Sequence, residues 1–238
     1  MISGDSWLDE VSPETRAAIR SRMMTIDVAA GQPFRQAGDR GSGFYQVESG
    51  YLKLSGLRAD GTRVLIVVYK DGACFGESTL VAHRPHRHTT VALVDTRVRA
   101  LNEGDFWEMY AAHPEIADAL CRKFANALGR TLASRDTRAA NRLGQMLAVT
   151  FRRLAQQCGA PRADGTTAIP LPLTQGDFAE HLEVTRQAVQ RDIGHLKSMG
   201  IIDQDRGGWV ILRPDLLDIG CSPVVPFRSR SAGARPGE

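Results

Sequence analysis

The sequence predicts an α+β protein: an N-terminal antiparallel β-roll or jelly roll, a long helix, and a C-terminal winged helix-turn-helix. Three observations support this prediction. Short apolar runs separated by turn residues extend from Ile26 to about Leu101. A helical pattern starts at Pro114 and reaches about Ala140, with no further glycine or proline except Gly129. Two short helical patterns and a hairpin pattern lie between Thr174 and Leu212.

Composition is that of an ordinary globular protein, with 42% apolar and 24% charged residues among 238, enough for two modest domains. The net charge of +3 is weakly compatible with an acidic polymer as partner. The longest apolar run, Val64 to Tyr69, is too short to span a membrane. The first residues, MISGDSWLDE, lack the cationic and apolar regions of a signal peptide.

The four cysteines, Cys74, Cys121, Cys158 and Cys221, are scattered and form no CxxC pair. Reduced thiols are the default for such a chain without a secretion signal, so we expect it in the cytoplasm and not in a membrane.

The N-terminal part is divided into a helical segment over residues 1–25 and a roll over residues 26–112. Ser12-Pro13-Glu14 is a typical helix start, with proline at the first helical position. Five short strands are expected in the roll, at Phe44 to Val47, Tyr51 to Leu54, Val64 to Tyr69, Val91 to Val94 and Val98 to Leu101.

The long helix, residues 113–140, would extend about 40 Å at ~1.5 Å per residue, longer than one small domain needs. A 4-3 spacing places five side chains on one side: Leu120, Phe124, Ala127, Thr131 and Ser134. We interpret this side as the seam of a homodimer, the alternative being a helix packed only on its own sheet.

The winged helix is assigned to residues 141–221, beginning with a helix from Asn141 to Gln157. Gln157 to Thr167 is expected to be a loop, and the Pro-, Ser- and Arg-rich residues 222–238 a disordered tail. Asp203 to Leu212 is a predicted hairpin around Gly207-Gly208.

Thr174 and Asp177 have the spacing of a helix cap, and Thr185 is the candidate cap of the next helix. Glu183 occupies the turn, where glycine is common. A left-handed backbone there would cost on the order of 1 kcal/mol.

The second short helix has one apolar and one polar side. Val189, Ile193 and Leu196 share a face, and the neighbouring face carries Arg186, Gln187, Gln190 and Arg191. Arginine can donate to guanine O6 and N7, and glutamine can pair with adenine, so this face suits the DNA major groove. With the caps Thr174 and Thr185, these residues are the candidate DNA contacts. The alternative is a helical hairpin with a solvated polar face.

A candidate ligand loop lies between two strands. Gly76-Glu77 is followed ten residues later by Arg87. A carboxylate can accept a hydrogen bond from a sugar hydroxyl, and backbone N–H groups with an arginine can bind a phosphate.

This order of parts resembles the Crp/Fnr family of bacterial transcription regulators, over about residues 20 to 215. The resemblance implies a sensory roll, a dimer made by the long helix, a winged helix on palindromic double-stranded DNA, and RNA polymerase as a partner. It also implies that Arg186, Gln187 and Arg191 read bases. Many relatives have glutamate in place of Gln187, which predicts a different preferred site.

The resemblance makes cAMP or cGMP a candidate effector. Cyclic-nucleotide-binding relatives share Gly76, Glu77 and Arg87, and use the position of Thr131 for the base. His88 stands where they have Ser or Thr, and Ala127 where the nucleotide binder has arginine. A different signal, or DNA binding without a ligand, is therefore the alternative. The first cysteine is Cys74, so the iron–sulfur cluster of the oxygen-sensing branch is not expected.

Metal binding and catalysis are two further candidate functions. His83, His86 and His88 could bind a metal ion, but Arg84 and Arg87 lie between them and no carboxylate or cysteine completes a set, so no metal is predicted. No nucleophile–base–orienter set indicates an enzyme. The remaining alternative to a DNA-binding regulator is a cyclic-nucleotide-sensing module whose winged helix contacts proteins; a gel-shift assay separates the two.

Overall fold

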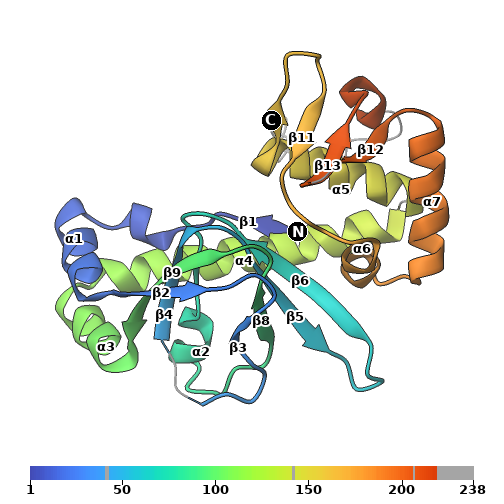
Figure 1. The fold of residues 1–238 in the computed structure, drawn as a ribbon. Helices are drawn as coiled ribbons and strands as arrows, with labels where there is room; N and C mark the ends of the chain where they lie inside the picture. The colour runs from blue at the N-terminus through green and yellow to red at the C-terminus, as the bar shows by residue number, and fades with distance from the viewer. Residues whose placement is uncertain (41–42, 141–142, 206, 219–238) are drawn as a thin grey trace, which may run out of the picture.

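The structure is a computed structural model that describes residues 1–40, 43–140, 143–205 and 207–218, with side chains in the long helix described up to Leu132. The predicted tail 222–238, Cys221 and the side chain of Ser134 lie outside this part. Figure 1 shows the β-roll, a long helix running behind it, and a second group of helices and strands at the far end of that helix.

The N-terminal segment contains strand β1 (Ile2–Ser3), a 3-10 turn (Trp7–Glu10) and helix α1 (Pro13–Arg22). The Ser12 side chain accepts a hydrogen bond from the Thr15 N–H, and Pro13 opens the helix, as predicted. Trp7 and Leu8 are buried against Phe44 and Phe106 of the roll. The segment is therefore part of the same core as the roll.

Two sheets make the roll in the described part of the chain. One has the order β1-β6-β5-β8-β3 and the other β2-β9-β4-β7. Their strands are β2 (Met24–Val28), β3 (Pro33–Arg35), β4 (Gly43–Ser49), β5 (Leu52–Leu57), β6 (Arg63–Tyr69), β7 (Cys74–Phe75), β8 (Thr89–Ala92) and β9 (Thr96–Asn102), with α2 (Glu77–Val81) between β7 and β8. Every strand pair is antiparallel except β1 with β6, and the predicted antiparallel roll is confirmed.

The short strands β1, β2, β3 and β7 were missed by the sequence analysis, and β8 begins two residues before the predicted Val91. Strands β1, β3 and β7 have only two or three residues, too few for a recognisable alternation, so their pairing depends on neighbours that are distant in sequence. In β2 a signal was present, because Met24, Ile26 and Val28 alternate with polar residues.

Two helices follow the roll, α3 (Glu103–Ala112) and the long α4 (Glu115–Ala140). Leu120 is 3% exposed and lies in the core with Trp7 and Leu101, and Phe124 packs against the same cluster. These two residues, taken from their spacing as the dimer seam, therefore face the helix's own roll. Leu128 and Leu132 are instead 61% and 53% exposed.

The C-terminal part consists of α5 (Leu143–Cys158), β10 (Ala160–Pro161), β11 (Thr167–Ile169), α6 (Gln175–Leu182), α7 (Arg186–Ser198), β12 (Ile202–Asp205), β13 (Gly208–Ile211) and a 3-10 turn (Pro214–Asp218). Its sheet has the order β10-β11-β13-β12. The stretch from Gln157 to Thr167, predicted as a loop, thus contains a short hairpin. Phe151, Phe178 and Trp209 contact one another in the core, and the Trp209 indole donates to the Leu173 carbonyl at 2.8 Å.

In the described residues, no helix combines the length and apolar character required to cross a membrane.

Candidate nucleic-acid interface and effector site

Helix α6 begins with the predicted cap. The Thr174 side chain accepts from the Asp177 N–H at 3.1 Å, and the Asp177 carboxylate accepts from the Thr174 N–H at 2.8 Å, which completes a capping box. Burial would raise the pKa of Asp177, but hydrogen bonds from Lys53 and Thr174 outweigh it, and the pKa lies below its ordinary value. Asp177 is thus an ionised carboxylate in a buried position.

Glu183 ends α6 in the left-handed conformation, with φ 61° and ψ 42°. The turn therefore has the backbone that usually favours glycine, at a cost on the order of 1 kcal/mol. An ion pair between Glu183 and Arg58 holds this side chain toward the β5–β6 hairpin of the roll.

Helix α7 has a buried and an exposed side, as its spacing predicted. The Thr185 side chain accepts from the Ala188 N–H at 3.2 Å, and Val189, Ile193 and Leu196 are buried. The predicted reading residues are all exposed: Arg186, Gln187, Gln190 and Arg191. At 3.6 residues per turn they cover an arc of about 140°. Apart from an ion pair between Arg191 and its neighbour Asp192 at 3.0 Å, this face is directed to solvent.

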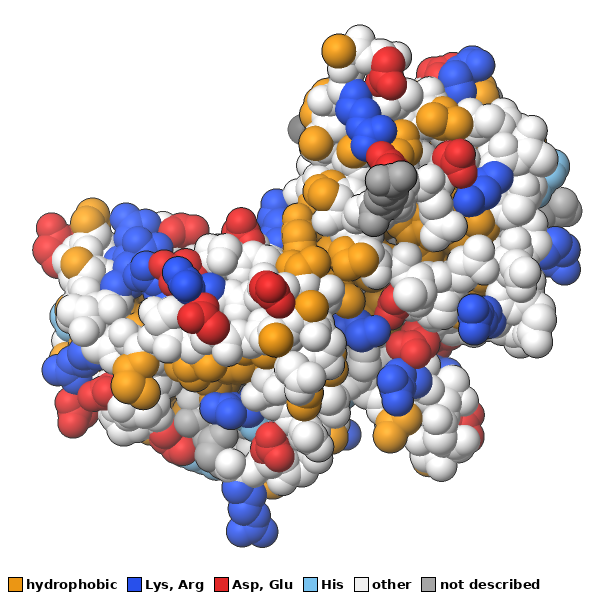
Figure 2. All heavy atoms as spheres, in the orientation of Figure 1, with side chains coloured by type: hydrophobic (Ala, Val, Ile, Leu, Met, Phe, Trp, Pro, Cys, Tyr) orange, Lys and Arg blue, Asp and Glu red, His pale blue; other side chains and the backbone are white. Residues whose placement is uncertain are grey.

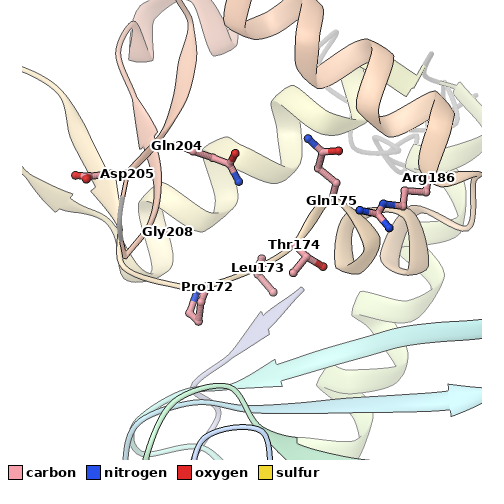
Figure 3. A pocket seen from close by; sticks show the side chains of 8 residues that line it. All are labelled: Pro172, Leu173, Thr174, Gln175, Arg186, Gln204, Asp205 and Gly208. Carbon is pink, nitrogen blue, oxygen red and sulfur yellow. The ribbon is translucent and has the colours of Figure 1, made fainter.

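A groove of about 430 Å³ lies beside this face, between the starts of α6 and α7 and the wing strands β12 and β13. Its lining residues are Pro172, Leu173, Thr174, Gln175, Arg186, Gln204, Asp205 and Gly208. Figure 3 shows Gln204 of β12 on one side and Gln175 and Arg186 on the other. The wing backbone is close-packed here, because a Cβ at Gly208 would lie 2.2 Å from the Ile169 carbonyl oxygen.

In the roll, the position of Gly76 has no room for a side chain. Its φ is 94°, and a Cβ there would lie 2.4 Å from the Gly43 carbonyl oxygen and 2.7 Å from the Tyr45 ring. The adjacent Glu77 is 4% exposed. One of its carboxylate oxygens pairs with Lys123 of α4, and Oε2 is buried with no hydrogen-bond partner among the described residues.

Lys123 was not predicted as a site residue. The only basic position expected on the long helix was that of Ala127, where the nucleotide binder has arginine. A signal was present, because Lys123 lies four residues before Ala127 and so shares its side of α4. Arg35 was also missed: its guanidinium donates to the Tyr45 hydroxyl at 3.0 and 3.1 Å.

The other predicted ligand residues are placed differently. Arg87 is exposed just before β8. The His88 ring lies against β5, where a Cβ at Gly56 would be 2.8 Å from it, and burial, followed by the charge of Arg87, lowers its pKa. The Thr131 hydroxyl donates to the Ala127 carbonyl at 2.9 Å within α4. The structure thus brings Glu77 to Lys123, whereas His88 and Thr131 have other neighbours.

The three histidines considered as metal ligands have separate surroundings. His83 stacks on Trp107 at 5.3 Å, the His86 backbone bonds to Gly38 and Asp39, and His88 faces Gly56. Within the part of the chain that the structure describes, no group of three or more His, Cys, Asp or Glu side chains could hold a metal ion.

Two protein-family models match the chain: a cyclic nucleotide-binding domain over residues 25–113 and a Crp-like helix-turn-helix domain over residues 137–218. The CRP-like cAMP-activated global transcriptional regulator of Mycobacterium tuberculosis is 23% identical over 220 residues, covering 92% of this chain and 94% of that protein. The nitrogen fixation regulation protein FixK of Azorhizobium caulinodans is 27% identical over 174 residues, covering 71% and 67%.

Solved structures have the same fold. FixK2 from Bradyrhizobium japonicum aligns with a TM-score of 0.69 at 19% identity, covering 82% of this chain and 95% of that one. A CooA mutant from Carboxydothermus hydrogenoformans aligns with a TM-score of 0.67 at 16% identity, covering 91% and 96%.

Together, the roll, the helix-turn-helix and these matches define a transcription regulator that joins a cyclic nucleotide-binding-type domain to a DNA-binding domain. The chain belongs to the Crp/Fnr family.

Proposed function

We propose that this regulator binds a two-fold-symmetric DNA site as a homodimer and reads base edges with Arg186, Gln187, Gln190 and Arg191. The observation that carries the proposal is the exposure of all four side chains on one face of a helix whose neighbouring face is buried. A helix with this arrangement can enter the major groove with its N-terminal residues against base edges. Half-sites are expected about one helical turn, roughly 34 Å, apart.

Phosphate contacts come from the helix caps beside the groove. Thr174 lines the groove, and Thr185 is exposed at the start of α7. Hydroxyl groups and backbone N–H groups at helix N-termini bind phosphate oxygens and set the register of the protein on the duplex.

An exposed stripe on α4 supports dimerisation. Cys121, Ala125, Leu128 and Leu132 are all exposed and follow a 4-3-4 spacing, which places them on one side of the helix. Exposed leucines at this spacing are favourably buried against a second copy of the same helix. This stripe replaces the seam of Leu120 and Phe124 that the sequence suggested.

The unpartnered oxygen of Glu77 favours a hydroxyl-bearing effector in the roll, with cAMP or cGMP the first candidates. Oε2 is buried beside Gly76, where a ribose hydroxyl would donate to it, and the exposed Arg87 would neutralise the phosphate. The name of the Mycobacterium tuberculosis relative, a cAMP-activated regulator, points to the same ligand class. His88 and Thr131 contribute less, because His88 packs on Gly56 and Thr131 bonds within its own helix.

Selection of DNA from a random library, followed by fluorescence anisotropy on the selected site, tests the DNA proposal. We expect a two-fold-symmetric site bound at least about 10³-fold more tightly than random DNA. Equal affinity for all sequences, or no binding, would contradict it and would favour a protein-contacting winged helix. Because the proposed partner is double-stranded DNA, we infer a cytoplasmic regulator, with RNA polymerase as a further partner.

Isothermal titration calorimetry with cAMP and cGMP tests the effector. We expect binding that Arg87→Leu abolishes, with Arg84→Leu as the matched control in the same loop. Wild-type protein that binds neither nucleotide but retains operator affinity would assign the roll to another signal.

A further inference from the structure

Helix α6 carries a row of carboxylates. Asp177 and Glu180 are three residues apart and lie on neighbouring positions of one side of the helix, and Glu183 follows as its left-handed C-terminal cap. The first helix of a helix-turn-helix crosses the DNA backbone. Three unneutralised carboxylates on that helix would be unfavourable close to the phosphates, since like charges repel.

The β5–β6 hairpin of the roll presents basic side chains to this row. Lys53 Nζ lies 2.8 Å from Asp177 Oδ1, with side chains 23% and 5% exposed. Arg58, just after β5, pairs with Glu183. Burial and the charge of Asp177 raise the pKa of Glu180, and the charges of Lys53 and Arg63 offset only part of this effect. Glu180 Oε2 is buried without a hydrogen-bond partner in the described residues. Figure 2 shows basic and acidic side chains meeting where the hairpin reaches the C-terminal part.

Apolar packing joins the same elements. Leu65 and Val68 of β6 are 1% and 0% exposed, in one buried cluster with Phe151 and Phe178 of the winged helix. The His181 ring of α6 is 3.4 Å from the Leu65 carbonyl oxygen. Figure 1 shows the hairpin extending beneath α6. The contact is therefore a packed interface rather than an isolated surface ion pair.

The docked arrangement leaves the proposed reading face open. Arg186, Gln187, Gln190 and Arg191 remain exposed while Lys53 and Arg58 hold α6. The two basic residues contact the capping-box residue and the turn residue of the helix-turn-helix, the positions that set the direction in which α6 begins and ends.

We propose that the basic hairpin of the roll clamps α6 in its DNA-binding orientation, with Lys53 and Arg58 as positioning residues that also neutralise its carboxylates. This inference rests on the proposed DNA-reading function of α7. It gives the roll a direct mechanical connection to the helix-turn-helix, in addition to the covalent connection through α4 and α5.

The test uses full-length protein carrying Lys53→Met and Arg58→Gln together. Operator affinity should fall about five- to tenfold, the combined effect of two lost charge pairs. Amide hydrogen exchange should quicken in α6 and β6 of the same variant, measured without DNA. Unchanged exchange or increased operator affinity would overturn the proposal, since the clamp would be absent or inhibitory.

A charge exchange separates direct contact from long-range attraction to DNA. Arg58→Glu alone should weaken operator binding, and Arg58→Glu with Glu183→Arg should restore it. Arg97→Glu with Glu183→Arg has the same net charge, but Arg97 pairs with Asp27 on the other sheet of the roll. Arg58 would then face an arginine at position 183, so this control should bind the operator more weakly than the wild type. Equal operator affinity of the two double variants would overturn the proposal.

The exchange measurement also separates the two proposals. If wild-type protein binds no DNA selectively, the DNA-reading function fails. Amide hydrogen exchange in α6, compared between the wild type and the double variant, still decides whether the hairpin positions the helix.

Discussion

Lys123 of α4 pairs with one carboxylate oxygen of Glu77, while the other oxygen of Glu77 is buried without a hydrogen-bond partner in the described residues. The two side chains are 12% and 5% exposed. This pair connects the predicted ligand loop to the long helix. A ligand that bonds to the second oxygen would therefore also affect the contact between the roll and α4.

Removing the Lys123 charge should destabilise the fold, because the Glu77 carboxylate would stay buried without its partner. Lys123→Met is expected to lower the free energy of unfolding by about 3–5 kcal/mol, because it leaves Glu77 charged, buried and unpaired. Glu77→Gln combined with Lys123→Met should recover much of this loss. Urea denaturation followed by circular dichroism measures both. The control Arg122→Met breaks an exposed pair with Glu10 and should cost less than about 1 kcal/mol. Equal losses for Lys123→Met and Arg122→Met would contradict the expectation.

Base reading by α7 predicts position-specific losses. Arg186→Ala or Arg191→Ala should weaken operator binding by ~1–3 kcal/mol and relax base choice at one position, because each arginine can donate two hydrogen bonds to a guanine. Anisotropy on operator variants provides the measurement. Arg213→Ala is the matched control, since Arg213 pairs with Asp215 at 3.0 Å after the wing. An equal loss on operator and random DNA would mean that these arginines contact phosphates alone.

The exposed stripe of α4 predicts where the dimer can be broken. Leu128→Glu with Leu132→Glu should give a monomer in sedimentation, because like charges would face each other across the two-fold axis. DNA affinity should also fall, since the two winged helices that contact the half-sites would no longer be linked in one dimer. Leu120→Glu should instead unfold the roll, because Leu120 is buried in it. A folded Leu128→Glu/Leu132→Glu variant that still sediments as a dimer would locate the contact elsewhere.

The depressed pKa of Asp177 predicts an acid-dependent contribution from Lys53. A carboxyl group with a lowered folded-state pKa stabilises the fold above its unfolded pKa, near 3.9, and loses that contribution as the pH falls through the folded-state value. The stability difference between wild type and Lys53→Met should therefore be full at neutral pH and shrink below about pH 4. Urea denaturation at a series of pH values measures it. A difference that does not change with pH would mean that Lys53 stabilises the protein through something other than the Asp177 charge.

Much of the fold could be predicted from the sequence because its signals are local. Three of these signals depend only on residues that are close in sequence. They are the caps Thr174 and Thr185, the spacing of Val189, Ile193 and Leu196, and the Gly207-Gly208 turn. The polar face proposed to read DNA followed from the same spacing, since Arg186, Gln187, Gln190 and Arg191 lie beside the apolar stripe of α7 and not within it.

Relations between distant segments were decided by the tertiary structure. Helical spacing places Leu120 and Phe124 on one side of α4, but it does not determine whether that side faces the roll or a second chain. The pairing of Glu77 with Lys123 and of Lys53 with Asp177 depends on how the sheets, α4 and α6 pack together. The sequence by itself thus determined the helices, the longer strands and which of their sides are apolar. Only the packed structure decided which surfaces meet. Each apolar or charged surface has several possible partners of matching character in the chain, and the sequence does not choose among them.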